Sequence, residues 1–206
     1  MRRLGRGLRK GLGMKWITLV AFVVVGLISF WFVANSRAAT ESPEYEVGQK
    51  DGRFEIRDYP EMKLASATTK GGAENGNFMT LFRYFDGGNE DSEKIAMTTP
   101  VLMERESEKG SMSFIVPASV AESGAPNPKS DKVTIRTTEK ARYAVMRFSR
   151  KGTQAADEAA AIEKLTAWMD AEQLEPKGRP LIAYYDPPWT PFFMRRNEVL
   201  VPVASS

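Results

Sequence analysis

The chain has 206 residues, a net charge of +3, and neither cysteine nor histidine. This length allows one domain with a substantial hydrophobic core. Without cysteine and histidine the chain can build no disulfide, thiolate nucleophile, Cys/His zinc site or Ser-His-Asp triad. Composition therefore excludes the enzyme classes that depend on these groups.

A basic leader, residues 1–15, precedes an apolar segment, residues 16–34, that has no charged residue. As a helix rising ~1.5 Å per residue, the segment would cover about 28 Å, close to the ~30 Å hydrocarbon core of a bilayer. Trp16 and Trp31 stand near its ends, as in an interfacial belt. Six cations and no acid precede the segment. Because cations favour the cytoplasmic side, this predicts a single-pass anchor in the cell inner membrane with the leader in the cytoplasm.

The alternative is a cleavable secretory signal, because Ser36 and Ala38 are small residues at the spacing that a signal peptidase reads. A signal has a shorter apolar region of about 7–15 residues, so the anchor is favoured. Either way, a linker (35–43) leads to a folded domain (44–206) on the periplasmic, non-cytoplasmic side. Because all six leading cations lie outside it, the rest of the chain carries a net −3, which argues against nucleic-acid binding.

Three strands are predicted at the start of the domain, over 45–47, 54–59 and 62–69. Asp51-Gly52 supplies the hairpin turn between the first two. The spacing then changes to helical over 74–85, where an apolar residue recurs every three or four positions and Gly87-Gly88 ends the pattern. Two further strands are predicted over 95–103 and 112–116.

The second half repeats the first in short segments. The matched pairs, in order, are 54–57 with 133–136, 64–69 with 143–148, 94–101 with 181–188, and 114–118 with 199–203. A helix over 157–171 corresponds to the first helix, and 117–130 is the predicted linker between halves. Five matches in one order indicate a duplicated strand-helix-strand-strand unit. We expect an α+β fold in which the two units form one mixed or antiparallel sheet, curled toward a barrel with two helices outside.

Four sequence segments stand out: KIAMTTPV at 94–101, YFDGGN at 84–89, YDPP at 185–188 and RRNEV at 195–199. Together they resemble the SOUL/haem-binding protein family. The resemblance extends from about residue 45 to 203. It implies a distorted antiparallel or mixed β-barrel of about eight strands with two outer helices. It also implies haem or another tetrapyrrole held in an apolar groove formed largely by the first helix, usually without catalysis.

The resemblance also implies which residues bind. The family's apolar and basic helix contacts fall on Phe82 and Arg83, and Phe78 and Met79 lie beside them. Without histidine or cysteine, direct ligation of iron would need methionine or tyrosine. The remaining candidates are therefore Met97, Tyr184 and Tyr185 as ligands, with Trp189 in the loop after Pro-Pro. Asn75 and Thr190 stand where some relatives carry basic residues, which predicts fewer propionate contacts.

Each of these features has a structural alternative. The helix stripe is also compatible with ordinary core packing, and the Met-Thr-Thr-Pro segment with a strand that ends at an edge proline. Asp186 or Glu198 is expected to pair with an arginine that would otherwise face the sheet alone. The apolar loop around Trp189 and Phe192 suits either a flat ligand or a membrane surface.

Three functional classes remain open from sequence. The first is a non-catalytic, membrane-anchored binding protein for haem or a related flat amphipathic tetrapyrrole, with no metal site of its own. The second is an enzyme acting on a tetrapyrrole, which would have only carboxylates, tyrosine and lysine for acid-base chemistry. The third is an interaction domain whose groove takes a peptide or a lipid.

Overall fold

The computed structural model describes residues 40–204 except 71–73, 106–108 and 150–151, together with Leu19, Val20 and Val24. The side chains of residues 69, 70, 74, 75 and 109 fall outside this description. The predicted leader, most of the predicted anchor and residues 35–39 of the linker also fall outside it. Among the residues that are described, no helix combines the length and apolar character needed to cross a bilayer.

Contacts divide the chain into two units, residues 1–39 and 40–206, and the second holds the whole sheet. Its strands are β1 (Glu46–Asp51), β2 (Phe54–Tyr59), β3 (Met62–Lys70), β4 (Val101–Glu104), β5 (Lys109–Ile115), β6 (Val133–Thr138), β7 (Ala141–Phe148), β8 (Leu181–Tyr184) and β9 (Asn197–Val203). They form one sheet in the order β1-β2-β7-β9-β8-β4-β5-β3-β6, and every pairing is antiparallel.

The strand order reflects the duplication seen in the sequence. Leaving β1 aside, the order reads the same from both ends when β2, β3, β4 and β5 are exchanged for β6, β7, β8 and β9. The centre of this symmetry is the β4–β8 pair, where Val101 lies opposite Tyr184 and Glu104 opposite Leu181. Two copies of one unit therefore join along their β4-type strands to make a single sheet.

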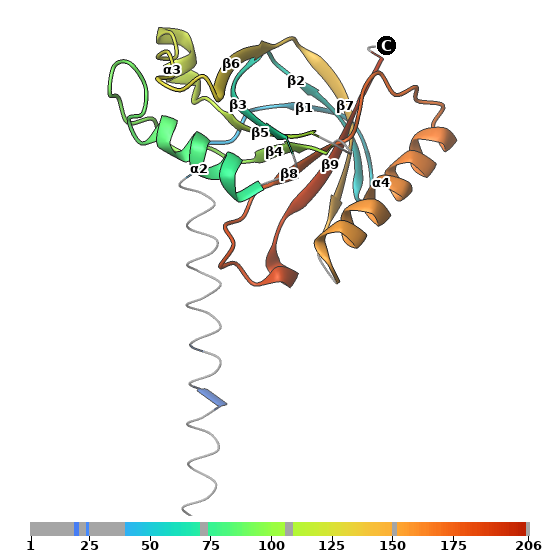
Figure 1. Ribbon diagram of the computed structural model, residues 1–206. Helices are drawn as coiled ribbons and strands as arrows, with labels where there is room; N and C mark the ends of the chain where they lie inside the picture. The colour runs from blue at the N-terminus through green and yellow to red at the C-terminus, as the bar shows by residue number, and fades with distance from the viewer. Residues whose placement is uncertain are drawn as a thin grey trace, which may run out of the picture. The chain divides into compact units, whose positions relative to one another are not determined.

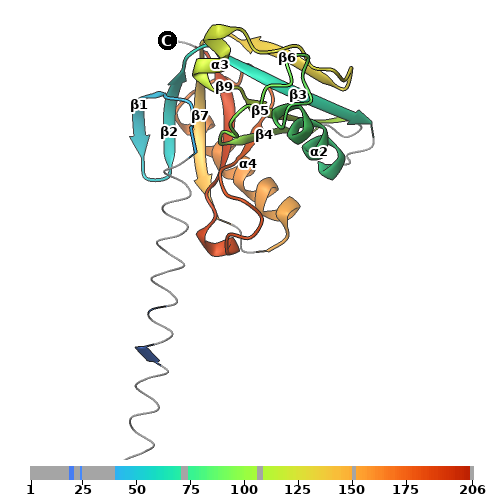
Figure 2. The same cartoon turned by 90° about the vertical axis from the view of Figure 1, so that its left-hand side faces the viewer.

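The expected barrel is not closed. Nine strands form an open sheet whose edges are β1 and β6, well apart at its two ends (Figure 2). Strand β1 is the one strand of the nine that lies outside the repeat. The predicted Asp51-Gly52 turn joins it to β2, and Gly52 takes a φ of +57° there. Every residue of β1 is exposed, so this strand has no apolar face to bury inside a barrel.

Two helices cover one face of the sheet, each over a different half (Figure 1). Helix α2 (Glu74–Phe85) packs on β3, β5 and β6, and α4 (Gln154–Ala171) on β7 and β9. Helix α2 has the bounds that the sequence predicts. A third helix, α3 (Ala118–Ser123), lies in the segment expected to be a linker; it begins just after Pro117, which is suited to a helix start.

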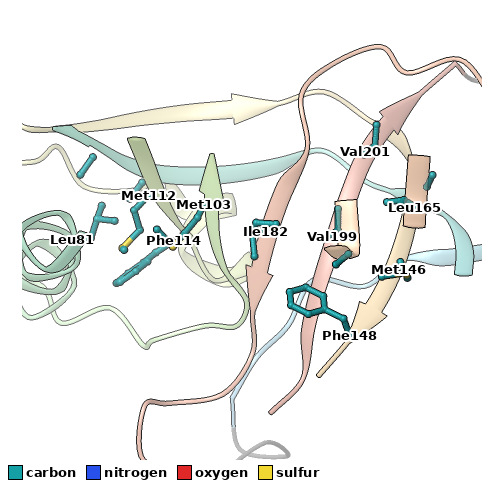
Figure 3. Packing of buried hydrophobic residues seen from close by; sticks show 14 of the residues in the cluster. Leu81, Met103, Met112, Phe114, Met146, Phe148, Leu165, Ile182, Val199 and Val201 are labelled. Carbon is teal, nitrogen blue, oxygen red and sulfur yellow. The ribbon is translucent and has the colours of Figure 1, made fainter. Parts of the chain in front are cut away.

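The main core lies between the sheet and the two helices. Buried side chains run from Leu81 of α2, through Phe114, Ile182 and Val199 on the sheet, to Leu165 of α4 (Figure 3). Alternate strand residues form a smaller buried cluster on the opposite face of the sheet. The positions of α2 and α4 are therefore fixed by one continuous core.

One predicted strand is mostly wrong. Residues 95–103 were expected to form a strand, but β4 begins only at Val101, directly after Pro100, which has no N–H to donate to a ladder. The preceding residues are held by other bonds: Thr98 Oγ1 donates to the carbonyl of Ile115 at 2.6 Å, and the Thr99 N–H donates to that of Glu41 at 2.8 Å. The sequence match between 94–101 and 181–188 is consequently out of register with the structure. Strand β4 follows Pro100, whereas β8 precedes Pro187.

Candidate functional site

Helix α2 carries apolar side chains on two faces. Leu81, Tyr84 and Phe85 are at most 2% exposed and anchor the helix to the sheet. Phe78 and Phe82, which the sequence places in the same stripe, are each 39% exposed. Half of the predicted core stripe is therefore available at the surface.

The two half-exposed phenylalanines stack on each other, and we call this pair the platform. One helical turn apart, their rings are nearly parallel, at 14°, with centroids 6.3 Å apart. The Phe78 ring also meets the buried Phe114 edge to face, at 5.5 Å between centroids. Phe114 is 1% exposed, so the core holds one ring of the platform in place. Such a surface is suited to stacking of a flat aromatic ligand.

A second row of side chains runs beside the platform. Met79 and Arg83, also four residues apart, are both exposed, and the Met79 side chain is a flexible, polarizable thioether. Among the described residues Arg83 forms no ion pair, so its guanidinium is available for a carboxylate. The surface offers apolar stacking and one cation side by side.

The end of α2 is fixed by a close backbone approach. The N–H of Gly88 donates to the Arg83 carbonyl at 2.7 Å, and a Cβ at Gly88 would lie only 2.5 Å from that oxygen. Asn89, fully buried, then donates its side-chain amide to the carbonyls of Tyr84 and Glu93. The YFDGGN segment thus has a structural role, which is to end the helix just after Arg83.

Two of the proposed ligands lie on the helix-bearing side of the sheet. Met97 is partly buried and packs against the main core from the segment before β4. Tyr184, on β8, is also partly buried there. Its hydroxyl donates a hydrogen bond to Glu158 of α4 and accepts one from Gln154 at 2.9 Å.

Tyr184 is therefore held in its neutral form. Burial raises the pKa of its phenol, and the hydrogen bond to the Glu158 carboxylate raises it further. Glu158, only 3% exposed, is itself paired with Arg105, whose Nη2 lies 3.0 Å from one carboxylate oxygen. A tyrosinate ligand for iron would need to lose a proton that this environment retains.

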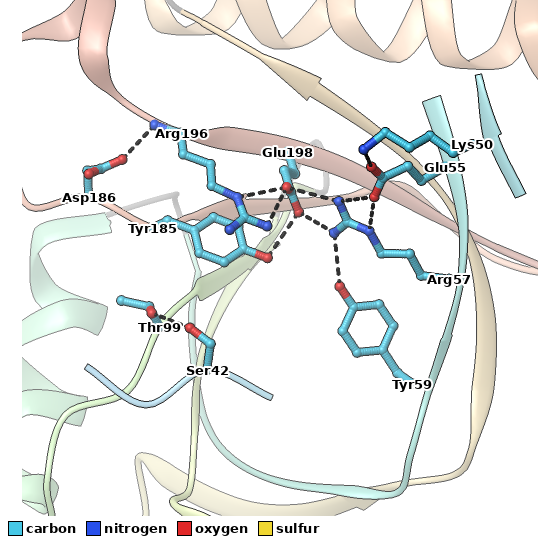
Figure 4. A network of polar contacts seen from close by, with 10 residues as sticks. All are labelled: Ser42, Lys50, Glu55, Arg57, Tyr59, Thr99, Tyr185, Asp186, Arg196 and Glu198. Carbon is cyan, nitrogen blue, oxygen red and sulfur yellow. Dashed lines mark hydrogen bonds and ion pairs between the residues drawn. The ribbon is translucent and has the colours of Figure 1, made fainter. Parts of the chain in front are cut away.

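Tyr185 faces the other side of the sheet. Its ring belongs to the smaller buried cluster, and its hydroxyl donates to Glu198 at 3.0 Å (Figure 4). Burial, followed by the charge of Glu198, raises the pKa of Tyr185. Successive residues of a strand point to opposite faces, so Tyr184 and Tyr185 cannot both line the α2 surface.

Glu198 is the centre of a buried ion network. Fully buried, it accepts two hydrogen bonds from Arg57, which is 4% exposed, at 2.7 and 3.2 Å, and it pairs with Arg196 at 2.8 Å. Asp186 accepts from the backbone N–H of Arg196 at 2.5 Å. The prediction that Asp186 or Glu198 pairs with an arginine is confirmed for Glu198, whose contacts with Arg57 and Arg196 are drawn in Figure 4.

Trp189 lies in a loop that stands out from the domain. We call residues 187–194 the aromatic loop, because Trp189, Phe192 and Phe193 are 77%, 55% and 66% exposed. Thr190, by contrast, is 3% exposed, so this position offers no surface contact to a propionate. Among the described residues, Trp189 makes no ring contact with Phe78 or Phe82.

A cavity lies elsewhere on the domain, and its chemistry is different. Its volume is about 740 Å³, and its walls come from β1, β2, the ends of β7 and β9, and α4. Lys50, Glu55, Arg57 and Glu198 in these walls are already paired with one another. A flat apolar ring would have to displace water from charged groups there, so the α2 platform is the better candidate.

Comparison with known protein families shows to which family the chain belongs. Residues 40–202 match the sequence profile described as SOUL heme-binding protein. The chain belongs to the SOUL haem-binding family. No curated protein matches the chain.

Solved structures share the fold of this SOUL domain at low sequence identity. The C-terminal domain of EcmrR is 11% identical, with a TM-score of 0.55, over 79% of this chain and 99% of that one. An uncharacterized conserved protein from Listeria innocua is 13% identical, with a TM-score of 0.56, over 74% and 92%. A hydrolase from the same organism is 12% identical, with a TM-score of 0.52, over 76% and 94%. These likenesses concern the fold of the SOUL domain alone.

The sequence patterns did not predict the pairing of Arg105 with Glu158. Glu158 stands among alanines at the start of α4 and looks like a solvent-facing residue. Two features together could have indicated its role: Glu158 lies at a buried position of the helical period, and it faces Tyr184, the residue just before the YDPP segment. Within the described residues no group of acidic side chains is arranged to hold a metal ion.

Proposed function

We propose that this chain is a membrane-anchored, non-catalytic binding protein for haem or a related tetrapyrrole, with its SOUL domain on the periplasmic side. The observation that carries the binding proposal is the platform of Phe78 and Phe82, two nearly parallel rings that are each 39% exposed. Arg83 beside them supplies a contact for a propionate.

The platform supports stacking better than ligation. Tyr184 is occupied by Glu158 and Gln154, and Tyr185 faces the opposite side of the sheet. Methionine is then the remaining ligand type among the candidates, as Met97 near the core or Met79 on α2. Affinity would rest mainly on ring burial and propionate pairing, with the iron contributing little.

The state of the buried acids supports binding without catalysis. Glu158 is tied to Arg105 and Tyr184, and Glu198 to Arg57 and Arg196. Burial disfavours ionisation of Glu198, but hydrogen bonds and charge from Arg57 and Arg196 outweigh it and lower its pKa. A general acid or base needs a free path to substrate and a suitable pKa. Both acids are buried and paired, and the lowered pKa of Glu198 is a further disadvantage.

Membrane attachment rests on the amino-acid sequence. The apolar segment 16–34 and the six cations before its end favour an uncleaved anchor with the leader in the cytoplasm. The folded unit that follows holds the complete sheet, both packed helices and the core, so the binding surface needs no residue of the anchor.

We expect Phe82→Ala to weaken hemin binding about tenfold. Loss of about 50–60 Å² of apolar contact, at ~25 cal/mol per Å², corresponds to about 1.4 kcal/mol. Arg83→Glu should weaken hemin binding as well, and should matter less for a porphyrin that lacks carboxylates. Absorbance titration in the Soret region measures both effects.

Arg53→Glu is the matched control for the charge change. Arg53 is an exposed arginine at the turn between β1 and β2, on the wall of the charged cavity. Its substitution should leave hemin affinity unchanged. If Arg53→Glu lowered the affinity and Arg83→Glu did not, the ligand would bind in that cavity and the platform proposal would be refuted.

A further inference from the structure

The aromatic loop exposes more apolar surface than a short connection needs. Trp189, Phe192 and Phe193 have exposed fractions of 77%, 55% and 66%, and the last two rings meet edge to face with centroids 5.6 Å apart. Aromatic side chains gathered in this way are costly in water and typical of an interaction site. Trp in particular is favoured at the boundary between lipid and water.

The loop is built to present these side chains and does not fold them inward. Arg195 donates from Nε to the Thr190 carbonyl at 2.7 Å and from Nη2 to the Pro188 carbonyl. Thr190 is buried, and its N–H donates to the carbonyl of Pro187 at 3.0 Å. These bonds close the loop on itself, so that Trp189 and the two phenylalanines stand on a fixed support.

The length of the connecting chain limits what the loop can reach. Glu41 belongs to the folded unit, since its carbonyl accepts from the Thr99 N–H and its carboxylate from the Ala118 N–H. The predicted membrane span ends at Ala34, so six residues, 35–40, separate the bilayer from the domain. Even fully extended at ~3.6 Å per residue, the seven steps from Ala34 to Glu41 reach only about 25 Å. The domain must therefore stay close to the membrane surface.

We propose that the aromatic loop inserts into the interfacial layer of the bilayer that holds the N-terminal anchor. This inference rests on the proposed membrane attachment. Burial of apolar side chains drives the insertion, and electrostatic attraction to anionic lipid does not, because the part of the chain after the anchor carries a net negative charge. A second contact with the membrane fixes the orientation of the domain, and with it the direction in which the α2 platform faces.

Quenching of tryptophan emission by brominated phosphatidylcholine tests the proposal in the full-length chain, reconstituted in nanodiscs. Trp16→Phe and Trp31→Phe remove the two tryptophans of the anchor. Trp168, a residue of α4 that is 9% exposed, then serves as an internal reference, and Trp189 as the probe. We expect brominated lipid to remove most of the Trp189 emission. Adding Trp189→Phe should leave only the Trp168 emission, unaffected by the bromine.

The outcomes separate this inference from those on which it rests. If the protein enters nanodiscs and brominated lipid does not quench Trp189, the loop does not insert and the inference is overturned. This holds whatever the result of hemin titration, which tests the proposed binding function separately. If the protein never associates with nanodiscs, the membrane anchor itself is refuted. Phe192→Ser with Phe193→Ser should reduce the quenching of Trp189 while leaving nanodisc association and hemin affinity intact, and quenching that persists undiminished would also contradict insertion of the loop.

Discussion

Replacing Glu198 with alanine should lower the free energy of unfolding by about 3–5 kcal/mol, since it leaves a buried arginine without its partner. Arg57 is only 4% exposed, and two of its hydrogen bonds go to this carboxylate. Arg196, stacked on the Tyr185 ring at 3.9 Å, would lose its carboxylate as well. Urea denaturation at neutral pH measures the loss.

The same network predicts how stability depends on pH. The folded-state pKa of Glu198 lies below its ordinary value of 4.5, although burial alone would raise it. Its contribution is therefore complete above about pH 5 and is lost as the pH falls through the folded-state pKa. Glu198→Ala should remove this part of the acid sensitivity, so that the wild-type and variant stabilities converge at low pH.

Asp58→Ala is the matched control for Glu198→Ala. Asp58 pairs with Arg142 at 2.9 Å on the same sheet, but the two side chains are 38% and 26% exposed. An exposed pair of this kind contributes about 0–1 kcal/mol. Equal losses in the two variants would show that burial of the Glu198 network adds nothing to stability.

Phe114→Ala should be similarly destabilising, by about 3–5 kcal/mol, and should also impair ligand binding. The Phe114 ring is 1% exposed and meets Phe85 and Phe78 edge to face, at 5.4 and 5.5 Å. Its removal leaves a cavity beneath α2 and takes away the support of one platform ring. Denaturation together with hemin titration, at a temperature where the variant is still folded, measures both effects.

Phe148→Ala separates the two consequences. Phe148 is 7% exposed in the same core, but it lies on β7 in the half of the sheet that α4 covers. This variant should lose comparable stability while retaining hemin affinity. If Phe148→Ala and Phe114→Ala reduced hemin affinity equally, the binding loss would reflect general destabilisation, and the platform would have no special part in it.

Local sequence patterns predicted the elements well where the signal was strong. The helix over 74–85 was placed correctly because its apolar spacing is regular and Gly87-Gly88 ends it. The pattern could not show that Phe78 and Phe82 stay half exposed while Leu81 and Phe85 are buried. All four have the same spacing signal, and which ones are buried depends on where β3 and β5 run beneath the helix.

Long-range pairing was the harder part of the prediction. Glu198 was expected to meet an arginine, and Arg196 is close in sequence, but Arg57 is 141 residues away on β2. The β2–β7–β9 order that brings them together follows from the duplicated topology, which short sequence matches indicate only in outline. The strand expected over 95–103 failed for a local reason, since Pro100 lacks the N–H that a ladder requires.

The comparison of hemin with metal-free protoporphyrin tests the central claim most directly. If the ligand is held by the Phe78 and Phe82 rings and by Arg83, both compounds should bind the full-length protein within about tenfold of each other, or ~1.4 kcal/mol. Phe82→Ala should weaken both alike. The account is contradicted if hemin binds far more tightly than the metal-free ring, and if substitution of Met97, Met79 or Tyr184 abolishes that difference while shifting the Soret band.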